Sequence, residues 1–380
     1  MNSNKDHSFS VLIPDGESWL AYPVQNCLAR IPGVKVIVLS NNAWDPMRFS
    51  RYTHQFYSYP EDDRQTKLAA IQDTLERTKI DVILPVDTQT IRLLSEHRDA
   101  LPPTTAHSPM PQVEAINIAE NKWHLAQWLH EQHIPCPETL LCRPDADFEA
   151  ELAKLSFPVL LKPTQQIGDD IGVGGRGIQI FDHPKALLDF YRNNTHIEYI
   201  VQSFIKGYDM GCNVLCNAGK IEAYSIQKGF MPSQVRFEPA AGIDFLENQG
   251  AYEVVSDLVG KLKWTGVANF DLRYDERDKQ IKIIEINPRF WGSLLGSFCA
   301  GVNFPYLSCL AGLGLEIPKT DAQPLRYVTG GAAFKMMWQG VLQRNPDHFH
   351  FDNSALDFIL RDPLPKVFSY TTKAYNRVLN

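Results

Sequence analysis

The chain has 380 residues and a formal net charge of −7, with 44% hydrophobic and 21% charged residues. This balance is typical of a folded globular protein of two or three domains, not of a disordered or fibrous one. The acidic balance disfavours a general binder of nucleic acid or of anionic membranes, and no apolar run reaches the length of a membrane span. We therefore expect neither partner.

The first third of the chain alternates short β-branched runs with helical segments. Strands are predicted at 10–14, 34–40 and 81–87, with a polar helix around 62–78 and other helices after the first and third runs. This alternation predicts a parallel sheet with crossover helices. Ligands gather at the carboxyl ends of such strands. Four residues there either line a pocket or serve only as turn and cap residues: Asp15, Gly16, Glu17 and Asp87.

A Pro-rich stretch at 101–111 reads as a linker between this part and the rest of the chain. The tail from about 320 to 380 contains no motif that we recognise. Between them, the predicted elements are a helix at 119–132, a strand at 157–163, a Gly-rich loop at 168–177, a short strand and a helix, a strand at 199–207, and two β-rich stretches at 211–228 and 265–287.

The beginning of the chain and its cysteines both favour a cytoplasmic protein. The segment MNSNKDHSFSVLIPDG lacks the charged part and apolar stretch of a signal peptide. The seven cysteines form no C-x-x-C pair, and their odd number fits no simple disulfide framework. We expect reduced thiols and a cytoplasmic location.

The Gly-rich loop has two interpretations. Gly172, Gly174 and Gly177 satisfy G-x-G-x-x-G, but a Rossmann fingerprint opens a helix and this loop leads into a strand. A glycine loop between strands can lay backbone N–H groups over a polyphosphate; the alternative is a plain mobile hairpin. Because no G-x-x-x-x-G-K-[ST] motif occurs, a P-loop NTPase is excluded.

Two lysines flank this loop in the sequence. Lys122 lies at a helix start, and Lys162 ends an apolar strand directly before a proline. A lysine at the end of a buried strand needs a partner for its charge, which phosphate oxygens would provide. Taken alone, either lysine is better explained as an ordinary side chain whose ammonium reaches solvent.

The strongest signal is NFDLRYDERDKQIKIIEINPRFWGS at 269–293. Asp271 lies in one predicted strand, a polar turn follows, and Glu285 and Asn287 lie in the next strand. Pairing the two strands brings Asp271 near the other two, which share a face because they are two residues apart. Two carboxylates and an amide oxygen are hard ligands of the kind that Mg²⁺ takes beside phosphates. Arg289 follows and can bind or orient an anionic group.

Together these motifs resemble the ATP-grasp superfamily. KIIEINPRFWGS is similar to its metal-binding signature, and FPVLLKP, the glycine loop and VQSFIKGYDMGCNV are similar to its ATP-clasping segment. The resemblance spans roughly residues 10 to 315, and NPRFWGS resembles carbamoyl-phosphate-synthase-like and D-aspartate-ligase-like carboxylate–amine ligases. It implies an α/β fold with a Rossmann-like pre-ATP-grasp domain and a two-lobed ATP-grasp module. The implied divisions are 1–112, 113–203 with the Gly-rich loop, 204–320 with the metal site, and a C-terminal extension at 321–380.

The resemblance also implies a role for each matching residue. ATP would be bound by Lys122, Lys162, the loop glycines Gly172, Gly174 and Gly175, and the hinge Gln202, Ser203, Phe204 and Ile205. Asp209 stands where the family usually has a ribose-binding glutamate. Mg²⁺, replaceable by Mn²⁺, would be held by Asp271, Glu285 and Asn287. Arg289 would stabilise transferred phosphate or bind substrate, with Lys228 and Arg236 as further catalytic candidates.

The implied activity is ligation of a small carboxylate to a small amine, through an acyl phosphate, with release of ADP and phosphate. Phosphorylation gives the carboxylate a good leaving group, and the protein mainly positions the reactants and stabilises charge. Two alternatives stay open: a biotin-carboxylase-like enzyme that activates bicarbonate, and an ATP-binding protein without catalysis. A homodimer is the default assembly.

Overall fold

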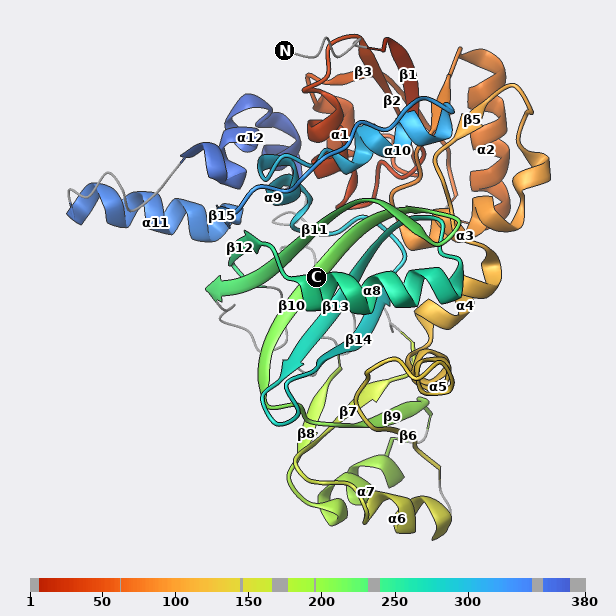
Figure 1. The fold of residues 1–380 in the computed structure, drawn as a ribbon. Helices are drawn as coiled ribbons and strands as arrows, with labels where there is room; N and C mark the ends of the chain where they lie inside the picture. The colour runs from red at the N-terminus through yellow and green to blue at the C-terminus, as the bar shows by residue number, and fades with distance from the viewer. Residues whose placement is uncertain are drawn as a thin grey trace.

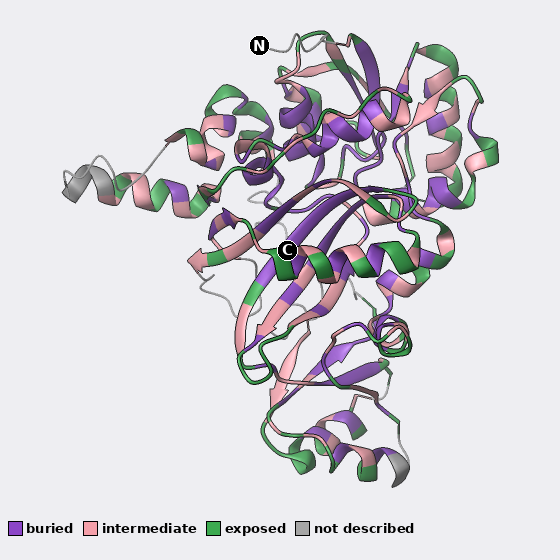
Figure 2. Ribbon diagram, viewed as in Figure 1, coloured by how far each residue is buried: buried purple, intermediate pink, exposed green. Residues whose placement is uncertain are grey.

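The computed structural model describes residues 7–61, 63–143, 146–165, 177–194, 196–231, 240–343 and 351–369. Three β-sheets lie one below another in Figure 1: the N-terminal sheet at the top, a six-stranded sheet in the middle and a four-stranded sheet at the bottom. In Figure 2 the buried residues gather in the central strands of the sheets, whereas several other strands are only partly buried. In the described part of the chain, no helix combines the length and the apolar character needed to cross a bilayer. All seven cysteines are free thiols.

The N-terminal sheet is parallel throughout, with strand order β3-β2-β1-β4-β5. The predicted parallel sheet is therefore confirmed, although the third predicted strand is shorter than expected and β3 and β5 were not foreseen. The elements of this part are β1 (Phe9–Ile13), α1 (Ala21–Leu28), β2 (Val34–Ser40), the 3₁₀ turn η1 (Pro46–Phe49), β3 (Thr53–Ser58), α2 (Arg64–Arg77), β4 (Val82–Ile83), α3 (Thr88–Glu96), the 3₁₀ turn η2 (Arg98–Ala100) and β5 (Ala106–His107).

The four-stranded sheet is antiparallel, with strand order β6-β9-β7-β8, and has a hydrophobic core of its own. Two helices, α4 and α5, connect it to the N-terminal sheet. The elements of this segment are α4 (Val113–Glu120), α5 (Lys122–Glu131), β6 (Thr139–Leu141), α6 (Ala146–Leu152), β7 (Val159–Pro163), β8 (Gln179–Phe181), α7 (Pro184–Arg192) and β9 (Tyr199–Ser203).

The six-stranded sheet is also antiparallel, with strand order β14-β13-β10-β11-β12-β15. Its edge strand β15 comes from the tail in which we had recognised no motif, and α11 projects away from the sheet in Figure 1. The elements are β10 (Gly207–Asn217), β11 (Lys220–Met231), β12 (Gly242–Leu246), α8 (Gln249–Leu262), β13 (Gly266–Asp275), β14 (Ile281–Asn287), α9 (Leu294–Cys299), α10 (Phe304–Gly312), β15 (Leu325–Val328), α11 (Gly330–Gln343), the 3₁₀ turn η4 (Phe351–Asn353) and α12 (Ala355–Arg361).

The two faces of this sheet belong to different cores because side chains alternate along each strand. In β13, Phe270 and Leu272 pack with residues of α4, α5 and α8, and α8 lies across the sheet in Figure 1. Val267, also in β13, packs on the other face with residues of α9, α10 and the N-terminal domain. The residues that follow Val267 on that second face are polar: Asn269, Asp271 and Arg273.

Candidate active site

The acidic residues lie opposite each other on the hairpin formed by β13 and β14. The register pairs Asp271 with Glu285 and Asn269 with Asn287, and a bulge follows Asp271. The Nδ2 of Asn287 donates to Oδ2 of Asp271 over 3.3 Å. The two carboxylates and the side-chain amide of Asn287 therefore lie together on one face, as the strand alternation predicts.

Lys122 and Lys162 reach this hairpin from two other elements. Lys122 begins α5, and its Nζ lies 3.1 Å from Oε1 of Glu285. Its backbone N–H donates to the carbonyl of Thr164 over 2.8 Å, which ties α5 to the end of β7. The Nζ of Lys162 donates to Oε1 of Gln202 over 2.7 Å.

Lys162 is a buried cation whose hydrogen-bond partner is a neutral amide. Its residue is only 6% exposed, and burial lowers the pKa of Lys162 to about 8. The nearby charges act in both directions: Glu285 and Asp271 raise this pKa, whereas Lys122 lowers it. A charged ammonium is costly in such a place unless an anion accompanies it, so the site is suited to a phosphate.

The predicted hinge is held by an arginine that no sequence motif indicates. Arg273 Nε donates to the carbonyl of Ile205 over 2.8 Å, and its Nη2 donates to the carbonyl of Gly207 over 3.1 Å. Its Nη1 forms an ion pair with Asp209, and its guanidinium lies 5.6 Å from the ring centroid of Phe204. Since Arg273 lies two residues after Asp271 in the same strand, the alternation could have shown that both share a face.

Ser203 ends β9, and its backbone N–H donates to the carbonyl of Glu138 over 2.9 Å. The amide of Gln202 contacts both Lys162 and Thr139, whose Oγ1 accepts from Nε2 over 3.2 Å. The hinge and Lys162 are thus linked through β9 and β7, which are neighbours in the four-stranded sheet.

Arg289 lies immediately after β14 and faces the N-terminal domain. Its Nη2 donates to Oδ1 of Asn287 over 3.4 Å, and its Nη1 donates to the carbonyl of Phe290 over 2.8 Å. The guanidinium is 5.8 Å from the ring centroid of Trp19, a residue of the loop between β1 and α1 that is 61% exposed. A Cβ added to Gly292 would meet the same indole at 3.3 Å, so Trp19 lies over the backbone that follows Arg289.

The acids of the N-terminal loops have partners of their own. Lys67 Nζ lies 2.9 Å from Oδ1 of Asp15 and 2.8 Å from Oε1 of Glu17. Asp87 Oδ2 accepts from the hydroxyl of Ser18 over 2.9 Å. These contacts hold the loop that carries Trp19, while the side chain of Asp87, the N-cap residue of α3, makes no capping hydrogen bond.

Lys228 lies on the opposite face of the sheet from the acidic residues. It pairs with Met210, which belongs to the core covered by α8. Its Nζ lies 3.6 Å from the ring centroid of Tyr208. The structure therefore does not bring Lys228 together with Asp271. Four other candidates lie outside the described residues: Gly172, Gly174, Gly175 and Arg236.

The donor set fits Mg²⁺ and a nucleotide polyphosphate. Among the described residues, no group of three His, Cys, Asp or Glu side chains could hold a metal; the oxygen donors here are two carboxylates and one amide. Gly211 lies between Asp271 and Gln227 in the register, and a Cβ there would come within 3.1 Å of the Gln227 side chain. Hard oxygen ligands beside a buried cation suit a metal that shares its ligands with phosphates.

Sequence reasoning missed a second polar layer beside the acids. Asn213, Ser225 and Asn269 are buried and hydrogen-bonded across neighbouring strands. For Asn269 the sequence held a signal, because a residue two positions before Asp271 in a strand lies on the same face. The other two could not be assigned to this face before the register of β10 and β11 was known.

Comparison with known proteins shows which proteins the chain is similar to. Residues 119–293 match the ATP-grasp domain. The chain is 30% identical over 188 residues to a D-aspartate ligase of Enterococcus faecium, which covers 44% of each chain. It is 23% identical over 311 residues to the arginine-specific carbamoyl phosphate synthase large chain of Halalkalibacterium halodurans, covering 76% of this chain and 28% of that one. The chain thus spans less than half the length of these curated relatives.

The fold is similar to that of N5-carboxyaminoimidazole synthetase from Staphylococcus aureus, solved with ADP. The TM-score is 0.67 at 18% sequence identity, over 89% of this chain and 87% of that chain. This likeness confirms the predicted α/β fold class, which the structure builds from an N-terminal parallel sheet and two antiparallel sheets. At this sequence identity the likeness shows a shared fold and nothing more.

Proposed function

Since this chain is a member of the ATP-grasp superfamily through residues 119–293, we propose that it is an ATP-dependent ligase that joins a small carboxylate to a small amine. The observation that carries this proposal is the meeting of Asp271, Glu285 and Asn287 with Lys122 on one side and Arg289 on the other. The similarity to a D-aspartate ligase supports the carboxylate–amine class.

In the proposed reaction, an oxygen of the substrate carboxylate attacks the γ-phosphorus of ATP. The bond from that phosphorus to the β–γ bridging oxygen breaks, and ADP leaves with the electron pair. The amine nitrogen then attacks the acyl carbon, the carbon–oxygen bond to phosphate breaks, and the amine loses a proton to solvent. No side chain of the protein forms a covalent bond, so positioning and charge stabilisation are the whole contribution.

Each charged group has a place in this scheme. Asp271, Glu285 and Asn287 would hold Mg²⁺, which supplies positive charge to the phosphate oxygens. Lys162 and Lys122 would contact phosphates of the nucleotide, and the segment from Gln202 to Ile205 would meet the adenine. Arg289 would bind the carboxylate or the phosphate transferred to it, because its planar fork matches either anion.

The proposal is tested by measuring ADP and phosphate release with pairs of amino acids and other small carboxylates, followed by mass spectrometry of the product. We expect release that requires both substrates, a product heavier than the carboxylate by the amine minus water, and no turnover in Glu285→Ala. Turnover that instead requires bicarbonate would favour a carboxylase. Nucleotide binding without ADP release for any pair would favour a protein that binds ATP without catalysis.

A further inference from the structure

A row of polar side chains crosses the six-stranded sheet beside the acids. Asn287, Asn269, Asn213 and Ser225 are opposite one another in successive strands, and we call these four residues the amide row. On one side of it lie Asp271 and Glu285. On the other side, one pair further along the strands, lie apolar residues of the core shared with the N-terminal domain: Val267, Leu215 and Ala223.

The amide row is a continuous chain of side-chain hydrogen bonds. Asn287 Nδ2 donates to Oδ1 of Asn269 over 3.2 Å, and Asn269 Nδ2 donates to Oδ1 of Asn213 over 2.9 Å. Asn213 Nδ2 donates in turn to Oγ of Ser225 and Oε1 of Gln227, over 3.2 and 3.3 Å. Asn213 and Ser225 are completely buried, so the bonds that join Asn269, Asn213 and Ser225 are shielded from water.

Two charged neighbours of Asn287 determine which way its amide points. Asp271, when ionised, can only accept, and it accepts from Nδ2 of Asn287. Arg289 can only donate, and it donates to Oδ1 of Asn287. Asn287 must therefore keep its nitrogen on the side of Asp271 and Asn269 and its oxygen on the side of Arg289. Reversing one amide in the row would place two donors or two acceptors against each other.

A role in stability alone does not account for this arrangement. A buried amide gains little over an apolar residue of similar shape, because its desolvation cost offsets most of its hydrogen-bond energy. An apolar side chain would not fix the orientation of the neighbouring amide, whereas a hydrogen-bonded amide does. Side chains that orient a metal ligand from behind typically affect metal affinity or activity by 10–100-fold.

We propose that Asn269 and Asn213 are positioning residues that orient the carboxamide oxygen of Asn287 toward the metal ion. This inference rests on the proposed function, because Asn287 is a metal ligand only in that scheme. Asn269 acts directly on Asn287, and Asn213 acts through Asn269. Neither residue touches the reacting atoms.

The test measures Mn²⁺ and ADP binding, without turnover. Mn²⁺ bound to the full-length protein with ADP is counted by electron paramagnetic resonance, and thermal unfolding is followed on the same samples. In Asn269→Leu, which removes the acceptor for Asn287, we expect the apparent Mn²⁺ constant to weaken by roughly 10–100-fold. In Asn269→Asp, which keeps the acceptor for Asn287 but loses the donor to Asn213, we expect a smaller loss than in Asn269→Leu. The matched control is Asn26→Leu, at a buried asparagine of α1.

Asn213→Ser provides a second variant if Asn269→Leu does not fold, because it shortens the partner of Asn269 without adding an apolar group. We expect it to weaken Mn²⁺ binding by severalfold. The inference is overturned if folded Asn269→Leu and Asn213→Ser bind Mn²⁺ as tightly as the unaltered protein does. It is also overturned if Asn26→Leu weakens Mn²⁺ binding as much as they do. Absence of metal-dependent ADP binding in the unaltered protein would instead contradict the proposed function.

Discussion

The two faces of β13 differ in what they contribute, although their residues alternate along one strand. Phe270 and Leu272 point into the core covered by α8, while Asp271 and Arg273 point to the face with Glu285 and the hinge. One face stabilises the sheet, and the other places two like charges opposite each other, which is destabilising in a β-pair. Lys122, whose Nζ lies 3.1 Å from Oε1 of Glu285, offsets part of this repulsion, and the packing of the hydrophobic face stabilises the sheet.

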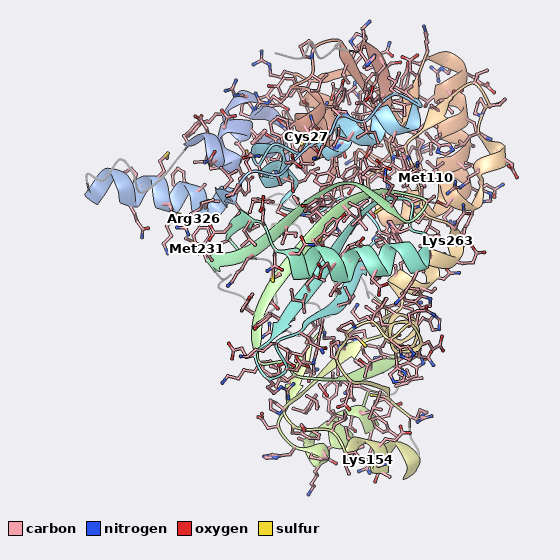
Figure 3. The ribbon with its side chains drawn as sticks, viewed as in Figure 1. Cys27, Met110, Lys154, Met231, Lys263 and Arg326 are labelled. Carbon is pink, nitrogen blue, oxygen red and sulfur yellow. The ribbon has the colours of Figure 1, made fainter. Side chains whose placement is uncertain are left out.

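Figure 3 shows the outer edge of the same sheet, where Met231 and Arg326 are labelled. Arg326 pairs with Asp244 over 2.8 and 3.1 Å and lies 4.1 Å from the ring centroid of Phe230. This cation is exposed and has both an acid and an aromatic ring as partners. Lys162 is buried with a neutral amide as its hydrogen-bond partner, so the two regions show the difference between a charge satisfied within the fold and one suited to a ligand.

The largest effect is expected on the hydrophobic face. Phe270→Ala removes a fully buried ring and should lower the free energy of unfolding by about 3–5 kcal/mol, through lost burial and the cavity left behind. Urea unfolding measures this loss. The metal and ADP constants of the folded protein should stay unchanged. A change in those constants as large as the change in stability would contradict the separation of the two faces.

Substitution of Asp271, the residue after Phe270, should impair turnover and leave stability intact. Asp271→Asn removes one of two facing carboxylates, so without metal the melting temperature should stay equal or rise. ATP turnover should fall by roughly 10²–10³-fold, which is typical for loss of one group that stabilises charge in a transition state. Thermal unfolding and ADP release measure the two quantities. Loss of stability together with full turnover would show that Asp271 is only a structural residue.

The pH dependence of nucleotide binding depends on Lys162. Its pKa is lowered by burial to about 8, so the protein without nucleotide loses this proton as pH rises through about 8. Bound phosphates would favour the charged form and raise that pKa, so binding takes up a proton in this range. ADP affinity should fall above pH 8 by up to about tenfold per pH unit.

Calorimetry in two buffers of different ionisation enthalpy measures both the affinity and the proton uptake. Lys162→Met, which keeps the length of the side chain, should bind ADP more weakly at pH 7 and lose this pH dependence. If ADP affinity fell equally steeply with pH above pH 8 in Lys162→Met and in the unaltered protein, Lys162 would be excluded as the titrating group.

The contrast between Asp271 and Lys228 shows what the sequence could predict. The relation of Asp271 to Glu285 depends on one short hairpin, so alternation and a turn were sufficient to predict it. The face on which Lys228 lies depends on the register of β11 with β10, and a one-residue shift would reverse it. The buried Asn213 was unpredictable for the same reason, since its partners come from two other strands. The α/β fold was predictable because its first strands and helices have clear periodicities.

The smallest effect is expected for Lys228→Met. Its ammonium lies over Tyr208 on the face opposite the acids, and a cation–π contact at a partly exposed site contributes about 0.5–1 kcal/mol. Stability should fall by no more than this amount, and ATP turnover should change by less than about twofold because the carboxylates and Arg289 keep their contacts. Urea unfolding and ADP release are again the measurements, with Lys162→Met as the variant expected to lose nucleotide affinity. A turnover loss above tenfold for Lys228→Met would mean that this ammonium crosses to the other face when substrates bind, and that the two faces of the sheet are not functionally separate.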